Sequence, residues 1–91
     1  MAMNKVLVDV QMLNGDLYED IQIIYADMME YSTVARRHKW PSAEEDQLRA
    51  IGYWAYAALK RTGRYDLNKG FDDFTAEVEM MSSEEVTPDP S

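Results

Sequence analysis

Neighbouring carboxylates are the residues of this sequence best suited to acid–base chemistry. They occur as Glu44-Glu45-Asp46 and as Asp72-Asp73, each in the first turn of an expected helix. Acidic side chains are favoured there by the helix dipole, without any catalytic role. General acid–base catalysis also needs a carboxyl group whose pKa is shifted in a cleft, and nothing else that such a site requires accompanies these acids. We therefore expect no catalytic residue and predict that the protein is not an enzyme.

The sequence also offers little to a metal ion or a cofactor. It contains no cysteine, which excludes disulfides, thiolate zinc sites and thiol nucleophiles. Its single histidine, His38, lies in the basic run Arg36-Arg37-His38-Lys39 and cannot by itself form a histidine-rich metal site. The glycine motifs that bind phosphates and the G-x-S-x-G motif are absent. We expect neither a metal nor a cofactor.

Length and charge limit the kinds of partner. Ninety-one residues make one small domain, and 17 acidic against nine basic side chains give a net charge of -8. This charge disfavours binding to nucleic acid or to an anionic membrane surface. Residues 50–59 form the longest uncharged stretch in the middle of the chain, about half of what a membrane-spanning helix needs. Residues 1–5 lack the longer apolar segment of a signal peptide, so we expect a cytoplasmic protein.

The first structural element that the sequence predicts is a β-hairpin over residues 5–24. Asn14-Gly15 is the strongest short-range hairpin signal, because a two-residue type I′ turn needs positive φ at both positions. This loop predicts a register with Met12 opposite Leu17, Val8 opposite Ile21 and Val6 opposite Ile23. It also leaves two unfavourable pairs, with Glu19 on the apolar face opposite Val10 and Asp9 opposite Asp20.

Three helices are expected after the hairpin, over about residues 26–39, 43–62 and 69–81. Pro41 ends the first of them. The second starts at the capping box Ser42-Ala43-Glu44-Glu45 and ends at Gly63, a residue typical of helix C-termini. In the third, which Asn68 would cap, the residues at helical spacing are Phe71, Phe74, Val78 and Met81.

The acidity is concentrated at the end of the chain. Residues 65–91 carry eight acidic groups against Lys69, whereas the first 64 residues carry nine acidic and eight basic groups. Residues 82–91 contain two prolines, three acids and almost no apolar side chain, so we predict a disordered acidic tail there. The predicted fold class is α+β, with one domain over residues 1–81 in which the hairpin packs on about three helices.

The middle helix is apolar around its whole circumference over residues 50–59. Such a helix must be covered on several sides. Either the hairpin and the two other helices cover it, or one side is left for a partner. Tyrosine and tryptophan are favoured at interfaces because they join a large apolar area to a polar tip. We predict that Tyr53, Trp54 and Tyr56 include residues that contact a partner or a second copy of the chain.

Seven methionines are a second candidate for partner contacts. Methionine is flexible and polarizable, and it recurs on surfaces that accept varied helices. The candidates at the ends of the expected first and third helices are Met28, Met29, Met80 and Met81. Their alternative role is ordinary filling of gaps in the core.

The order of these elements and three segments resemble the tail assembly chaperones of long-tailed bacteriophages, especially those of phages that infect actinobacteria. The segments are RRHKWP at residues 36–41, YWAYAALKRTG at residues 53–63 and FDDFTAEV at residues 71–78. The likeness covers about residues 5–81.

The resemblance implies a non-enzymatic assembly factor in the cytoplasm of the infected cell. Members of this family coat the helical, aggregation-prone tape measure protein before the tail tube polymerises, contact the tail tube protein and are absent from the virion. Many are made in two forms through a ribosomal frameshift, and this chain looks like the short form. Because many copies coat one client, we also expect self-association.

Two other functions stay open from the sequence. One is an acidic inhibitor that mimics nucleic acid and occupies a basic host protein. That role requires acids spaced like phosphates on a rigid surface, whereas here they gather in one expected helix and the expected tail. The other is a structural tail or connector component that remains in the virion.

Overall fold

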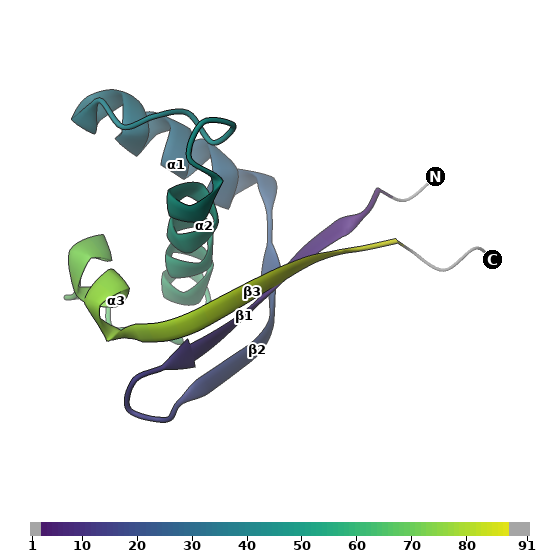
Figure 1. The fold of residues 1–91 in the computed structure, drawn as a ribbon, viewed down its shortest axis with the longest axis vertical. Helices are drawn as coiled ribbons and strands as arrows, with labels where there is room; N and C mark the ends of the chain where they lie inside the picture. The colour runs from purple at the N-terminus through teal and green to yellow at the C-terminus, as the bar shows by residue number, and fades with distance from the viewer. Residues whose placement is uncertain (1–2, 88–91) are drawn as a thin grey trace.

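The computed structural model describes residues 3–87 and, for that part of the chain, shows a small α+β fold with three helices and a three-stranded antiparallel sheet (Figure 1). The elements in chain order are β1 (Lys5–Met12), β2 (Leu17–Ile23), α1 (Tyr25–His38), α2 (Gln47–Arg61), α3 (Phe71–Glu77) and β3 (Val78–Val86). The strand order is β2-β1-β3, so β1 is central. The predicted fold class is confirmed, and the predicted hairpin has a third strand beside it.

The helices cover one face of the sheet. In Figure 1, α1 and α2 stand on the same side of the sheet, and α3 lies next to α2 where the chain turns into β3. Alternate residues of the hairpin are buried beneath the helices, as the period of a half-buried strand requires. These residues are Val8, Val10, Met12, Ile21 and Ile23. Burial of each such side chain stabilises the fold by about 1.5–3 kcal/mol.

The hairpin turn differs from the predicted type I′ turn. Of the Asn14-Gly15 pair, Gly15 alone has positive φ, at 99°. The Gly15 amide donates to the Met12 carbonyl (3.0 Å), and the Met12 amide donates to the Asp16 carbonyl (2.8 Å). These bonds define a three-residue loop, in which only the last residue needs positive φ. The Asn14 side-chain oxygen accepts a hydrogen bond from the Asp16 amide (2.9 Å).

The longer loop moves the pairing near the turn by one residue. Val10 lies opposite Tyr18, and Gln11 lies opposite Leu17. A β-bulge between Val8 and Val10 then shifts the register back. Farther from the turn, the pairs Val8–Ile21 and Val6–Ile23 match the prediction, because the one-residue shift at the loop and the one-residue shift at the bulge cancel.

The bulge removes both unfavourable pairs of the predicted register. Asp20 adopts a φ of 54°, and its amide donates to the Asp9 carboxylate at 2.8 Å. Glu19, which we predicted opposite Val10 on the apolar face, is exposed, and Tyr18 takes its place. One extra residue therefore lets an acidic strand keep its carboxylates out of the core.

The end of α1 is close to the prediction, and Pro41 follows it. Lys39 takes a φ of 60°, and the Trp40 amide donates to the Ala35 carbonyl at 2.8 Å. This is a Schellman-type helix end, although lysine stands where glycine is usual. The reversal folds Trp40 back toward α1, where its ring centroid lies 6.3 Å from that of Tyr31.

The second helix starts later than predicted. The Glu45 amide donates to the Ser42 hydroxyl at 3.4 Å, which is one bond of the predicted capping box, and that hydroxyl donates to Glu45 Oε1 at 3.1 Å, but these bonds close a single turn that precedes α2. The cap of α2 is Asp46, whose carboxylate accepts the Arg49 amide at 3.1 Å. At the other end Gly63, with a φ of 74°, follows the helix as predicted.

The third predicted helix, over residues 69–81, is wrong in its second half. Gly70 caps α3 in place of Asn68, α3 ends at Glu77, and the chain passes directly into β3. Val78 and Met81 lie opposite buried residues of β1, on either side of a bulge in β3. A bulged strand places two apolar residues three positions apart on one face, which is the spacing that predicted a helix.

The second half of β3 also lies in the region that we predicted as a disordered tail. Pairing with β1 continues to Val86, which lies opposite Lys5. The side chains of residues 82–85 are polar, but backbone pairing with a central strand requires no apolar side chain. Residues 88–91 of the predicted tail lie outside the described residues.

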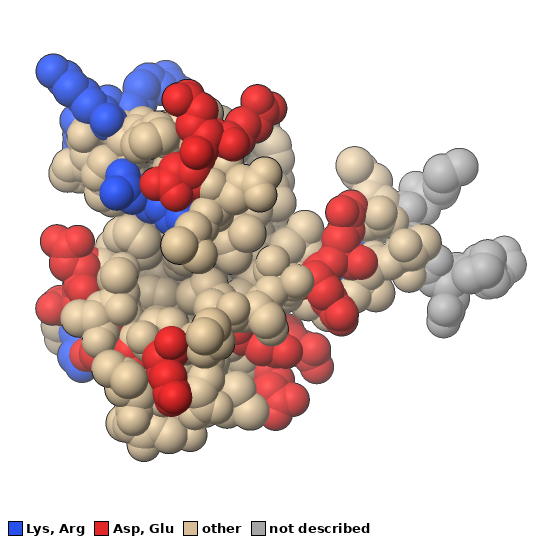
Figure 2. Space-filling view, viewed as in Figure 1, with Lys and Arg blue, Asp and Glu red and all other residues tan. Residues whose placement is uncertain are grey.

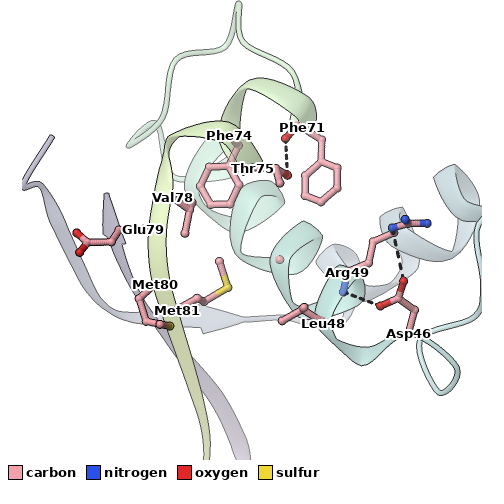
Figure 3. A pocket seen from close by; sticks show the side chains of 11 residues that line it. Asp46, Leu48, Arg49, Phe71, Phe74, Thr75, Val78, Glu79, Met80 and Met81 are labelled. Atoms are coloured by element: carbon pink, nitrogen blue, oxygen red, sulfur yellow. Dashed lines mark hydrogen bonds and ion pairs between the residues drawn. The ribbon is translucent and has the colours of Figure 1, made fainter. Parts of the chain in front are cut away.

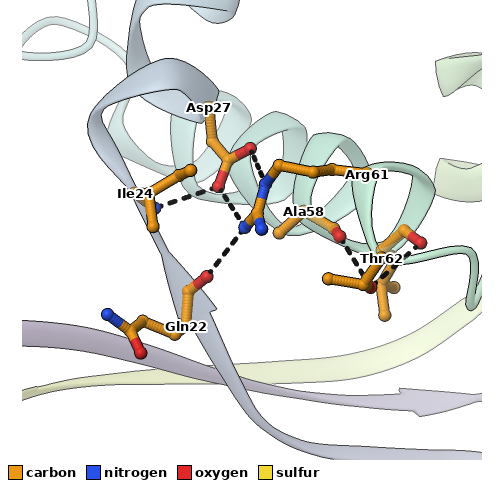
Figure 4. A network of polar contacts seen from close by, with 7 residues as sticks. Gln22, Ile24, Asp27, Ala58, Arg61 and Thr62 are labelled. Carbon is orange, nitrogen blue, oxygen red and sulfur yellow. Dashed lines mark hydrogen bonds and ion pairs between the residues drawn. The ribbon is translucent and has the colours of Figure 1, made fainter.

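A buried ion pair joins β2, α1 and α2 (Figure 4). Asp27 is 2% exposed and accepts hydrogen bonds from Arg61, with Nε to Oδ1 at 3.2 Å and Nη2 to Oδ2 at 3.0 Å. Asp27 Oδ2 also accepts the Ile24 amide (3.0 Å), and Arg61 Nη2 donates to the Gln22 carbonyl (3.2 Å). Paired, charge-assisted hydrogen bonds of this kind fix orientation as well as adding energy. They attach the end of α2 to the junction between β2 and α1.

Removal of the cation from this pair should cost more stability than removal of the anion. Arg61→Met leaves a buried carboxylate without its partner, and we expect a loss of about 3 kcal/mol in the free energy of unfolding. Asp27→Asn leaves Arg61 able to reach water, since that side chain is 37% exposed, and should cost about 1–2 kcal/mol.

Urea denaturation measures both losses. Arg36→Met, at the exposed end of α1, is the matched control and should change the free energy of unfolding by less than about 0.5 kcal/mol. A wild-type value for Arg61→Met would contradict the role given to the ion pair.

Candidate functional site: an apolar groove beside β3

An apolar groove of about 420 Å³ opens between the start of α2, α3 and the start of β3 (Figure 3). Its apolar lining consists of Leu48, Gly52, Phe71, Phe74, Val78, Met80 and Met81. The polar residues around it are Asp46, Arg49, Thr75 and Glu79. Figure 2 shows the hollow in tan in the middle of this face, with charged side chains around it. Its size and lining are those of sites that accept a few apolar groups.

The first turns of α2 form one side of the groove. Leu48 and Gly52 are four residues apart and so lie on the same face of the helix. Leu48 is 85% exposed, and Gly52 presents no side chain at all. A Cβ at Gly52 would stand 3.9 Å from the ring of Phe71, which is ordinary contact. The groove therefore runs across bare helix backbone at this point.

The aromatic residues of α3 form the opposite side. Phe74 is buried, and Phe71 is half-buried. The ring centroid of Phe71 lies 5.1 Å from that of Tyr53 and 5.6 Å from that of Tyr56, so both tyrosines stand behind this wall. The Gly70 amide donates to the carboxylate of Asp73 at 2.9 Å and fixes the start of α3.

The free edge of β3 forms the third side. Residues 78–81 all contribute to the lining. Val78 and Met81 lie opposite buried residues of β1, whereas Glu79 and Met80 stand at the bulge between them, and no residue of β1 lines the groove. The other edge of β3 is paired with β1. The groove thus lies along the edge of β3 that has no neighbouring strand among the described residues.

A polar cluster holds α3 and the start of β3 in place. Lys69 Nζ donates to Glu77 Oε1 at 2.6 Å, and the Tyr65 hydroxyl donates to Glu77 Oε2 at 3.0 Å. The ammonium group of Lys69 holds the pKa of the Glu77 carboxyl below its ordinary value. Glu77 therefore stays ionised at neutral pH and keeps both bonds, which fix the last turn of α3.

The structure corrects the prediction for Tyr53 and Tyr56 of the middle helix, whereas a partner contact at Trp54 stays a prediction. Tyr53 and Tyr56 are 5% and 6% exposed and belong to the core. The Tyr53 hydroxyl donates to Glu30 Oε1 at 3.1 Å, and burial, followed by the nearby Glu30 carboxylate, raises the pKa of Tyr53. Trp54 is half-buried, and its Nε1 has no hydrogen-bond partner among the described residues. The fold itself covers both tyrosine rings, so neither is left open to a partner.

The four predicted methionines fall in two places. Met80 and Met81 both border the groove but lie on different sides of β3, so Met81 points in toward α2 and is half-buried, whereas Met80 is 69% exposed (Figure 3). Met28 and Met29 lie on α1 and do not line the groove. Met28 packs against the core, whereas Met29 is exposed. Their role in partner binding stays a prediction.

Sequence reasoning missed Leu48 and Phe71 as members of the site. Phe71 was identified only by its helical spacing, and Leu48 was not singled out. The available signal was Gly52, a glycine inside an otherwise strong helix, which is unfavourable unless something lies close to it.

The described residues hold no group of three histidine or acidic side chains arranged to bind a metal ion. Within residues 3–87, no helix has both the length and the apolar character to cross a lipid bilayer. Comparison of the chain with protein-family models, curated proteins and solved structures gives no match.

A Gly52→Ala variant should fill the floor of the groove without harm to the fold. The new methyl group meets Phe71 at ordinary contact distance, and alanine is the better helix former by about 1 kcal/mol. We expect the free energy of unfolding to rise by up to about 1 kcal/mol in urea denaturation. A clear loss of stability would show that the space above Gly52 is already filled.

Proposed function

We propose that the chain is a tail assembly chaperone of a long-tailed bacteriophage. In this role it binds the tape measure protein in the infected cell, keeps it soluble and helps to recruit the tail tube protein. The proposal rests on the sequence resemblance together with the apolar groove. The observation that carries it is the exposure of two large apolar side chains, Leu48 and Met80, on two sides of one apolar groove.

The exposure of Leu48 and Met80 is informative because the two side chains lie around the same groove. A single exposed leucine is ordinary in a monomeric protein, but exposed apolar residues gathered around an apolar hollow are typical of interaction sites. Met80 and Met81 add flexible thioethers that adapt to different apolar partners. A net charge of -8 helps to keep a protein with such a surface soluble. These properties suit a protein that binds an apolar client.

The decisive experiment is co-expression with the tape measure protein of the same phage. The wild-type chain should increase the soluble fraction of this client several-fold. Leu48→Glu and Met80→Glu each place a charge in the groove at an exposed position, so they should lose most of the effect while remaining folded. Leu67→Glu is the matched control, because Leu67 is also 69% exposed but does not line the groove.

A wild-type chain that leaves the client insoluble would contradict the proposal, as would groove variants that work as well as the control.

Two further measurements separate the alternative functions. A nucleic-acid mimic should lose its partner as the salt concentration rises, whereas apolar contact should persist. A connector component should be found in purified virions by mass spectrometry, whereas a chaperone should be missing.

A further inference from the structure

We propose that the apolar groove binds its partner as an extended, basic segment that adds a fourth strand to the sheet along the free edge of β3. The proposed function supplies only the identity of the partner. The conformation and the charge of the bound segment follow from the geometry of the groove and from the side chains of β3.

The first step concerns the backbone of β3. This nine-residue strand lies at the edge of the sheet, with β1 on one side and the groove on the other. Alternate residues of an edge strand direct their amide and carbonyl groups away from the sheet, where they can pair with another chain. A segment that lies in the groove therefore meets unpaired backbone groups. An extended segment can satisfy them, whereas a helix uses its own backbone groups internally.

The second step concerns the apolar side chains. In an added strand, every second side chain points to the same face. The α2 and α3 walls of the groove stand on one side of the β3 edge, as Figure 3 shows for Leu48 and Phe71. One or two alternate apolar side chains of the partner would fit between these walls, over the bare backbone at Gly52. Backbone pairing then supplies affinity, and the groove selects apolar residues at alternate positions.

The third step concerns charge. β3 carries Glu79, Glu84 and Glu85 and no basic residue. Figure 2 shows acidic side chains over the arm where the ends of β1 and β3 run on beyond the helices. The nearest cation on the rim, Arg49, is already paired with Asp46 at 3.6 Å. An added strand with lysine or arginine would therefore meet complementary charge near Glu79 and again at Glu84 and Glu85.

The same glutamates argue against a second copy of β3 as the occupant. Like charges that face each other across paired strands are destabilising. The bulge next to Met80 affects any added strand alike, so charge is what separates a basic partner from a second copy. The edge is thus closed to its own copies and open to a basic partner.

The test uses a labelled synthetic peptide with alternating lysine and valine residues and the wild-type protein. Fluorescence anisotropy measures affinity at low salt. The controls are the same sequence with alternate backbone amides N-methylated and a helix-forming peptide of equal charge and apolar content. We expect binding of the first peptide, a loss of at least about tenfold on N-methylation, and weaker binding of the helical peptide.

Variants of the protein locate the site. Glu84→Lys should weaken the binding of the lysine–valine peptide about three- to fivefold, because it reverses an exposed charge on the edge. Glu19→Lys makes the same change on β2, at the opposite edge of the sheet, and should leave affinity unchanged. Leu48→Asn removes the exposed apolar side chain without adding a charge that attracts the basic peptide, so it should weaken binding through the groove while the fold is retained.

Three results would overturn the proposal: no binding of the extended peptide, equal binding of the N-methylated or helical peptide, or equal effects of Glu84→Lys and Glu19→Lys. These results are independent of the client test. A chain that binds the peptide but does not solubilise the tape measure protein would refute the proposed function alone. A chain that solubilises the client but prefers the helical peptide would refute only the added strand.

Discussion

The structure depends on how a chain of this size covers one helix that is apolar on all sides. α2 must be enclosed, and the described elements do this from three directions: the sheet, α1 and α3. The second half of α2 is the more enclosed one, because its small alanines let neighbouring elements approach closely. Ala55, Ala58 and Leu59 are fully buried there, and the Asp27–Arg61 pair fastens this end to the β2–α1 junction. The first turns of α2 lack such cover.

The uncovered part follows from the shortness of α3. This helix has only seven residues before the chain extends into β3. It therefore shields Tyr53 and Tyr56 with Phe71 but does not reach Leu48. The strand that follows runs past the start of α2 and presents its edge there. The groove is thus a direct result of the change from helix to strand at Val78, and α2 is anchored at its C-terminal end and open at its N-terminal end.

Much of the fold could be predicted from local sequence patterns. The hairpin, the positions of the first two helices and the glycine end of α2 follow from alternation, capping residues and Pro41. The turn type and the bulge could not, because they arise from the conflict between Asn14-Gly15 and the acidic residues of β2. The strand at residues 78–86 was missed for two reasons. The spacing of Val78 and Met81 fits a helix and a bulged strand equally well, and the polar residues after them are held by backbone pairing with β1.

The candidate site was predicted only in part. Met80 and Met81 were identified for their chemistry, but as members of a helix rather than of a strand edge. Tyr53 and Tyr56 were chosen because they are aromatic in an all-round apolar helix, and the same property places them in the core. Composition alone does not tell which side of such a helix stays open. That depends on the length of α3, which the spacing of its apolar residues did not predict correctly.

Amide hydrogen exchange tests the role of the groove most directly. The measurement compares the chain alone with the chain in its co-expressed complex with the tape measure protein. If the groove beside β3 is the binding site, exchange should slow at residues 78–86 and in the first turns of α2, with little change at β2. Slower exchange confined to β2 or α1, with β3 unchanged, would contradict it.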